Sequence, residues 1–224
     1  MTRLPHTLLI EELTADVRPV RPLASPLRRA ASTLMALALV ATLAVLVASN
    51  LTQFRSLHAG REVLLMLEMA AMLATGALAI TGAFFASVPG RARGWLLAPL
   101  PFFAAWLLFS GTGCYNLMIS NGGTGSGQPS GDSTHCLLFI LGVSALLAPA
   151  VIWRLSRAAP IDPLPVALLG GLGVAALSAF LLQFFHPFAV TFLDLGVHLA
   201  AILLVVGVTG LLNRRALIGR KLPV

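Results

Sequence analysis

The sequence has few charged residues. Only 10% of its 224 residues are charged, with eight acidic and fifteen basic side chains, whereas 58% are hydrophobic. A soluble globular domain averages about 25% charged and roughly 45–50% apolar residues. So few charges cannot cover the surface of a water-soluble protein of this size. The composition therefore excludes a soluble globular fold and indicates that lipid surrounds most of the chain.

The sequence also lacks the short motifs that mark common catalytic and metal sites. It contains no G-x-S-x-G motif and no glycine-rich phosphate-binding motif that precedes a helix. It has only two cysteines, and neither a C-x-x-C nor an H-x-x-x-H pair is present, so no zinc motif is matched. We therefore expect no enzymatic activity, no cofactor and no small-molecule substrate.

The net charge of +7 does not indicate a nucleic-acid partner. The basic residues lie in short segments between or outside the apolar runs. No basic face with interleaved aromatic residues is present on which bases could stack. We therefore predict no direct contact with nucleic acid and interpret the charge as a signal of membrane orientation.

Long apolar runs predict an all-α, polytopic membrane protein. A helix needs about 20 apolar residues to cross the hydrocarbon core, because all its backbone groups must be paired internally. The third run is short and contains Pro99 and Pro101, which predict a kink. The six predicted spans are Ala31–Ser49, Val63–Ser87, Gly94–Ser110, Cys136–Trp153, Leu164–Phe185 and Ala189–Leu212.

The predicted fifth span is rich in small residues. They are Gly170, Gly171, Gly173, Ala175, Ala176 and Ser178. Small residues at such spacing allow neighbouring helices to approach closely in lipid. We therefore expect this helix to pack tightly against its neighbours.

The distribution of Lys and Arg predicts the orientation. Thirteen basic residues lie in the leader, the tail and the connections on their side, and only two, Arg55 and Arg61, lie in the opposite connections. Cytoplasmic loops carry the excess of basic residues. We predict a bacterial inner-membrane protein with both termini in the cytoplasm. The thirteen are Arg3, Arg18, Arg21, Arg28, Arg29, Arg91, Arg93, Arg154, Arg157, Arg214, Arg215, Arg220 and Lys221.

Three regions follow from this topology. Residues 1–30 form a cytoplasmic leader, residues 31–212 a six-helix transmembrane domain with a periplasmic loop at 111–135, and residues 213–224 a basic tail. The first apolar run begins only near Ala30, after a polar segment with several prolines. We therefore expect an uncleaved anchor rather than a signal peptide.

The leader contains a predicted amphipathic helix at Thr7–Val17, which the prolines after Arg18 end. Its apolar positions are Leu9, Ile10, Leu13 and Val17, and its acidic positions are Glu11, Glu12 and Asp16. A helix this short needs a partner surface in water, so it could dock in a groove of a cytoplasmic protein. A helix on the membrane interface and a disordered leader are the alternatives, although interfacial helices usually carry a basic polar face.

The two cysteines are predicted to lie on the periplasmic side, where disulfides persist. Cys114 follows the third span and Cys136 begins the fourth. A bond between them would close a loop of about 22 residues and contribute roughly 3 kcal/mol in the chain-entropy model. A structural disulfide, a redox-sensitive pair and a metal site that includes His135 all remain open.

Ionisable residues inside the predicted spans form a third feature. Glu68 lies in the second span, Asp194 and His198 lie one turn apart in the sixth, and His186 ends the fifth. Such residues usually face the interior of a helix bundle and have partners there. All four could meet in its outer half. The cluster could be a satisfied polar core, a sensing pocket for a proton, metal or oxidant, or the path of a transported ion.

Several segments together resemble the NrsF-type proteins. The resemblance covers nearly the whole chain and depends on the order of short motifs. These are Leu8–Leu23, Ser87–Arg91, Gly113-Cys114, Cys136–Ile140, Phe185-His186-Pro187 and His198.

The resemblance implies a membrane-bound anti-sigma factor. Members of this family restrain an extracytoplasmic-function sigma factor, typically of the sigma F type, and release it under oxidative or metal stress. It implies that Cys114 and Cys136 take part in sensing or in holding the periplasmic side. The leader residues expected to contribute to the sigma contact are Leu9, Ile10, Glu11, Glu12, Leu13, Asp16, Val17 and Arg18.

Overall fold

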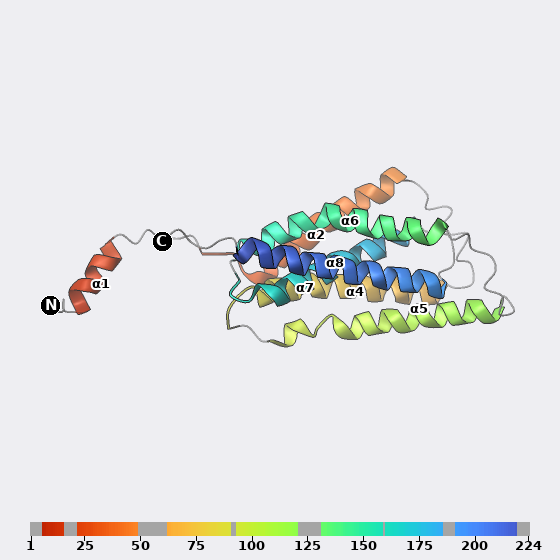
Figure 1. Ribbon diagram of the computed structural model, residues 1–224, viewed down its shortest axis with the longest axis horizontal. Coiled ribbons are helices and arrows are strands. Elements are labelled where there is room, and N and C mark those ends of the chain that lie inside the picture. Colours follow the sequence, from red (N-terminus) through yellow and green to blue (C-terminus); the bar gives the residue numbers. More distant parts are fainter. Residues whose placement is uncertain are drawn as a thin grey trace.

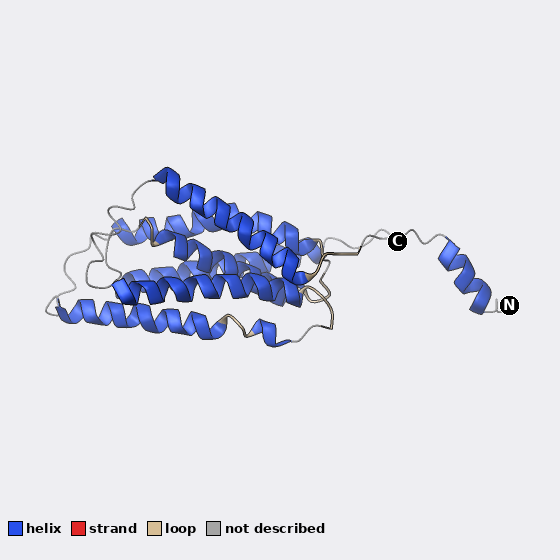
Figure 2. Ribbon diagram, turned by 180° about the vertical axis from the view of Figure 1, so that it is seen from behind, coloured by secondary structure: helices blue, strands red, loops and turns tan. Residues whose placement is uncertain are grey.

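In the computed structural model, residues 6–15, 22–48, 62–90, 93–120, 131–158, 160–185 and 191–218 are described. Figure 2 shows helices and connecting loops, and no strand, within these ranges. The elements are α1 (His6–Ala15), α2 (Pro26–Ala48), α4 (Glu62–Ala86), the short 3₁₀ helix η1 (Arg93–Leu96), α5 (Leu100–Ser120), α6 (Gly131–Ser156), α7 (Pro163–Leu182) and α8 (Phe192–Ile218) (Figure 1).

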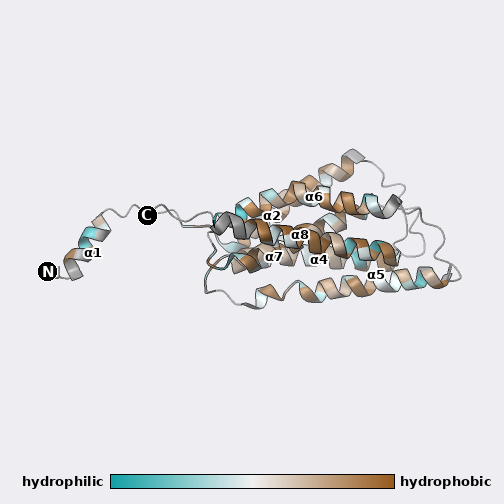
Figure 3. Ribbon diagram, in the orientation of Figure 1, coloured by the Kyte–Doolittle hydropathy of each residue, from teal (hydrophilic) through white to brown (hydrophobic). Residues whose placement is uncertain are grey.

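Six of the helices, α2 and α4 to α8, are long and apolar enough to cross a membrane. Apolar residues run along each of them (Figure 3). They alternate in direction, so that α2 begins and α8 ends at the same end of the bundle (Figure 1). The predicted all-α fold with six spans is therefore confirmed. The side of the membrane at which the termini lie stays a prediction.

The third span is longer than predicted, and its helix is interrupted at the prolines, between η1 and α5. Pro99 and Pro101 lie at the start of α5, after η1. A proline in the first turn of a helix is tolerated because its missing N–H would have no partner there. The helix then continues past Ser110 to Ser120. Cys114 therefore lies within α5 rather than after it, and the predicted loop 111–135 is too long.

Other helix ends also differ from the predicted ones. The first span begins earlier, at Pro26, within the predicted leader. The last span begins later, at Phe192, and its helix extends to Ile218, into the predicted basic tail. The leader helix ends at Ala15. Asp16 and Val17, which were predicted to be its last residues, lie outside the described residues, as does Arg18.

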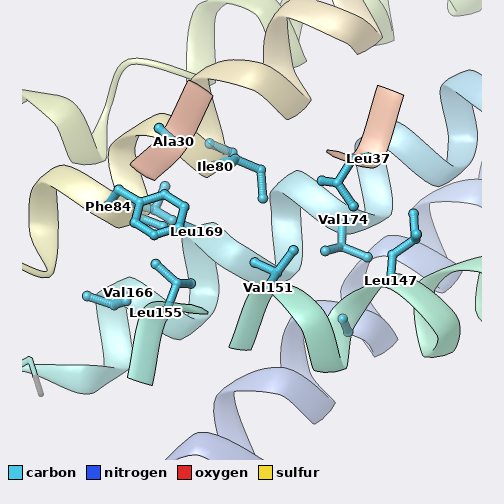
Figure 4. Packing of buried hydrophobic residues seen from close by; sticks show 13 residues of the cluster. Ala30, Leu37, Ile80, Phe84, Leu147, Val151, Leu155, Val166, Leu169 and Val174 are labelled. Carbon is cyan, nitrogen blue, oxygen red and sulfur yellow. The ribbon is translucent and has the colours of Figure 1, made fainter. Parts of the chain in front are cut away.

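Helix α7 occupies the centre of the bundle and packs against α4, α6 and α8. Thirteen of its twenty residues are buried. One apolar cluster joins α7 to α2, α4 and α6, with Ile80, Phe84, Val151 and Val174 among its buried members (Figure 4). A second cluster, which contains Trp106 and Cys136, joins α7 to α4, α5, α6 and α8.

Glycines make the close approach of α7 to its neighbours possible. A Cβ atom on Gly173 would lie 2.7 Å from the side chain of Ile80 in α4. A Cβ on Gly171 would collide with the Thr209 hydroxyl and lie 3.1 Å from the Val206 Cα in α8. Only glycine fits at these contacts, so the predicted tight packing of the fifth span is confirmed.

Gly171→Ala and Gly207→Ala should change stability in opposite directions. Gly207 is exposed in α8 with open space around it, so alanine should stabilise the helix by roughly 0.5–1 kcal/mol. At Gly171 the new Cβ must displace Thr209, whose hydroxyl donates to the Val205 carbonyl oxygen at 2.8 Å. Overpacking of this kind destabilises by about 1–3 kcal/mol. Unfolding of the full-length protein in detergent measures both values, and equal shifts would contradict the close approach.

Candidate functional site

The three described members of the predicted ionisable cluster are all buried. The exposed fractions of their side chains are 5% for Glu68, 1% for Asp194 and 3% for His198. Glu68 lies on the buried face of α4, three residues after the buried Leu65 and four before the buried Met72. His186 lies outside the described residues. The predicted inward orientation of Glu68, Asp194 and His198 is therefore confirmed.

Asp194 forms a capping box at the start of α8. Thr191 donates to Asp194 Oδ2 through its main-chain N–H at 3.0 Å and through its hydroxyl at 2.7 Å. In return, the Asp194 N–H donates to Thr191 Oγ1 at 3.3 Å. This reciprocal arrangement satisfies donors that a helix start leaves unpaired. The Thr-x-x-Asp spacing before an apolar run is the sequence signal for it, and our prediction for the sixth span missed it.

His198 makes a hydrogen bond with the main chain of Asp194. Its Nδ1 lies 2.6 Å from the Asp194 carbonyl oxygen. A carbonyl oxygen only accepts, so Nδ1 carries a proton and donates. This bond fixes the orientation of the imidazole ring on α8. The two residues share one helix face as predicted, but this contact does not pass through the carboxylate.

Glu68 and His198 flank a small cavity in the bundle. Its lining comes from α4, α5, α7 and α8: Met72, Thr75, Phe103, Trp106, Ala176, Ala179 and Ile202. Glu68 lies one turn before Met72 and His198 one turn before Ile202. Helices α4 and α8 start at the same end of the bundle (Figure 1). The two ionisable side chains therefore belong to the same depth of the bundle, near that end.

Both cysteine side chains are buried, each with 2% of its surface exposed. Cys136 packs in the second apolar cluster together with Trp106 and Ile140. Helix α5 packs chiefly against α4, whereas α6 packs against α7 and α8. A bond between the two sulfur atoms would link α5 to α6, two helices that both contact α8. That disulfide stays a prediction.

The metal alternative finds no preformed site in the described ranges. No group of three His, Cys, Asp or Glu side chains there could hold a metal ion. His135, the proposed third ligand, is exposed, whereas Cys136 beside it is buried.

Trp106 is a buried polar residue that the sequence analysis missed. Its indole Nε1 is enclosed and has no hydrogen-bond partner among the described residues. A buried donor without a partner costs about 1–3 kcal/mol. The spacing of Trp106, Ser110 and Cys114 at i, i+4 and i+8 places all three on the buried face of α5. That spacing is the signal that could have identified it.

The sequence analysis also missed a junction between α2 and α6. Arg29 Nη2 donates to the Arg154 carbonyl oxygen at 2.8 Å. Arg154 Nη1 lies 3.0 Å from Ser32 Oγ and 3.2 Å from Thr33 Oγ1 and donates to both. We call these four residues the arginine junction. It ties the first turns of α2, which follow the leader, to the last turn of α6.

Helix α1 presents both apolar and acidic side chains to its surroundings. Leu8 and Ile10 are 50% and 59% exposed, and Glu11 and Glu12 are also exposed. The side chains of Leu9 and Leu13 lie outside the described part, as do the whole of residues 16–18. The assignment of these residues to a partner contact stays a prediction.

Asp194→Ala should destabilise the protein more than Asp194→Asn. Alanine removes the acceptor of both Thr191 donors, which should lower the free energy of unfolding by about 1–2 kcal/mol. Asparagine keeps an acceptor oxygen at the same place and should lose less than half of that. Chemical unfolding in detergent measures the difference, with Thr191→Ser and Thr191→Ala as a matched pair. If both variants lost the same free energy of unfolding, the negative charge of Asp194, and not its capping hydrogen bonds, would be the stabilising feature.

Comparisons with known proteins give one result. A family model, NrsF, described as negative regulator of sigma F, matches residues 13–218. Searches of the curated proteins and of the solved structures found no match. The matched range covers all six spans and the end of α1. The chain therefore belongs to the NrsF family of negative regulators of sigma F.

Proposed function

We propose that the protein is an anti-sigma factor of the bacterial inner membrane that holds an extracytoplasmic-function sigma factor through its cytoplasmic leader. Family membership supports the anti-sigma role. The observation that carries the proposal is the exposed, mixed apolar and acidic surface of α1, which precedes the first membrane-spanning helix. A regulator of this kind acts by binding and needs no catalytic group.

The leader suits binding to a protein better than binding to lipid. With ten residues, α1 is too short to be stable alone in water and gains stability when a partner covers Leu8, Ile10 and their neighbours. Its exposed polar side chains, Glu11 and Glu12, would repel an anionic lipid surface. A free energy of binding near 8 kcal/mol, roughly micromolar affinity, suffices for a partner that is kept at high local concentration.

Leu9→Asp/Leu13→Asp should abolish retention of the sigma factor. The two carboxylates would place charge on the apolar face that we assign to the contact, and the affinity should fall at least about tenfold, or 1.4 kcal/mol. The matched control Thr14→Asp/Ala15→Asp adds the same charge at exposed positions of α1. It should lower the affinity for the sigma factor less than about threefold. Pull-down from detergent extracts measures both. Equal retention by the two variants would remove the leader from the contact.

The proposed orientation places the leader and the tail in the cytoplasm. Thirteen basic residues on their side against two on the other support it. An even number of spans, with α2 beginning and α8 ending at one end of the bundle, is consistent with termini on one side (Figure 1).

Introduced cysteines should report this orientation. Cys114 and Cys136 are both changed to serine, so that a thiol reagent can react only at the introduced position. In this background Ser126→Cys should react with a membrane-impermeant maleimide in intact spheroplasts, and Ser25→Cys only after the membrane is opened. The reverse pattern would place the leader outside the cell.

We assign signal detection to the periplasmic half of the bundle. Helix α6 contains Cys136 near its start and Arg154 near its end, and at Arg154 the arginine junction joins it to α2. Oxidation of the thiols, or binding of a soft metal to them, would shift α6 and, through the junction, the helix that carries the leader. The cluster of Glu68, Asp194 and His198, with His186 as its predicted fourth member, would adjust to this shift.

Cys114→Ser/Cys136→Ser should remove the response and leave repression intact. Serine is nearly isosteric with cysteine but neither forms disulfides nor binds soft metals well. A sigma-dependent reporter should then stay off after hydrogen peroxide or cadmium, whereas the wild type turns on. Thr112→Ala, an exposed change on α5, is the control and should respond normally. A full response from the double variant would assign sensing to other groups.

The alternative function, an ion or metal transporter, has less support. It would use Glu68, Asp194 and His198 as a path. The carboxylate of Asp194 caps α8 and His198 donates to a main-chain oxygen. These contacts give two of the three residues a structural role, which favours the regulator.

A further inference from the structure

The arginine junction carries positive charge that no described side chain neutralises. Neither Arg29 nor Arg154 forms an ion pair with a carboxylate in the described ranges; their acceptors are a carbonyl and two hydroxyl oxygens. Arg29 Nη1 is enclosed and has no acceptor there. The guanidinium of Arg29 also lies over the Phe84 ring, 4.9 Å from its centroid. These contacts therefore hold the Arg29 guanidinium in place, while its Nη1 has no acceptor in the described ranges.

The position of the junction on α2 adds to the positive potential. Arg29 lies in the first turn of this helix, and the positive end of the helix dipole is located there. No acidic residue is present in that turn. An anion at this place would be stabilised by the guanidinium groups and by the helix start together.

The aromatic residue beside the junction indicates its depth in the membrane. Trp153, which precedes Arg154, is 55% exposed. The guanidinium of Arg157 lies 3.8 Å from the centre of its ring. Exposed tryptophan rings prefer the headgroup level at the membrane–water interface. The junction therefore lies at the depth at which lipid phosphate groups occur.

Apolar surface continues from the junction into the membrane on both helices. On α2, Leu27 and Met35 are 61% and 73% exposed, and on α6 Leu146 is 70% exposed. Beyond Leu37 no described residue of α2 is buried. Acyl chains can cover such a surface, whereas an acidic peptide would leave it bare.

We propose that the arginine junction is a binding site for the phosphate group of an anionic phospholipid, whose acyl chains lie along the exposed faces of α2 and α6. Guanidinium groups bind phosphate through paired hydrogen bonds, and basic pockets between transmembrane helices bind anionic headgroups. The site is independent of the proposed anti-sigma function. It stabilises the place from which the leader emerges.

Native mass spectrometry of the full-length protein with dioleoylphosphatidylglycerol tests the site. Arg29→Gln/Arg154→Gln should weaken binding of the first lipid at least tenfold. Arg28→Gln/Arg157→Gln removes the same charge from the same end and should weaken it less than threefold. If both double variants weakened binding equally, the lipid would be attracted only by the net positive charge at this end of the bundle, and the proposal would be overturned. Displacement of the lipid by equimolar inorganic phosphate would also overturn it, because the acyl chains would then contribute nothing.

Photo-cross-linking of the wild-type protein tests the site even if the Arg29→Gln/Arg154→Gln variant does not fold. A phosphatidylglycerol with a photoreactive group near its phosphate should cross-link mainly within residues 27–35 and 146–157. Labels spread evenly over all six spans would contradict the site.

The leader is the competing occupant, and a third variant distinguishes it. Neutralising its acids with Glu11→Gln/Glu12→Gln/Asp16→Asn should leave lipid binding unchanged. A severalfold increase in lipid binding would assign the junction to the leader instead.

Discussion

Helix α7 packs closely against α4 and α8, and this packing determines where the other membrane-spanning helices lie. In lipid, apolar side chains gain little by leaving their solvent, so helices associate through packing and hydrogen bonds. Glycines at 171 and 173 bring the helix backbones together, and both apolar clusters form around α7. Each of the other membrane-spanning helices, α2, α5 and α6, contacts this group. The depth of the ionisable residues and of the thiols follows from that placement.

Several buried polar groups in the bundle are satisfied within their own helices. The hydroxyls of Thr75, Ser178 and Thr209 donate to carbonyl oxygens four residues earlier, and His198 contacts the carbonyl of Asp194 in the same way. Other side-chain hydrogen bonds connect different helices, among them the Ser144–Ser178 pair and those of the arginine junction. Because the junction lies where the leader enters the membrane, it is the contact best placed to link α6 with the leader.

The number and type of helices could be predicted from the sequence, because an apolar run of about twenty residues in lipid must form a helix to pair its own backbone groups. The sequence also predicted the burial of Glu68, Asp194 and His198, since charge inside a span must face the bundle. Helix ends were less predictable: Pro99 and Pro101 break a helix in its interior but start one at its first turn. Partners were not predictable for Trp106, Arg29 and Arg154, because their contacts depend on which helices become neighbours. The capping box at Thr191 was visible in the sequence and was overlooked.

We propose that the leader restrains a sigma factor and that the membrane domain anchors the leader at the membrane. Deletion of residues 1–23 tests it most directly, because α2 begins only at Pro26 and the six spans stay intact. A sigma-dependent reporter should become constitutively active in cells that carry the deletion, with an unchanged amount of the protein in the membrane. Continued repression by the truncated protein would contradict the account.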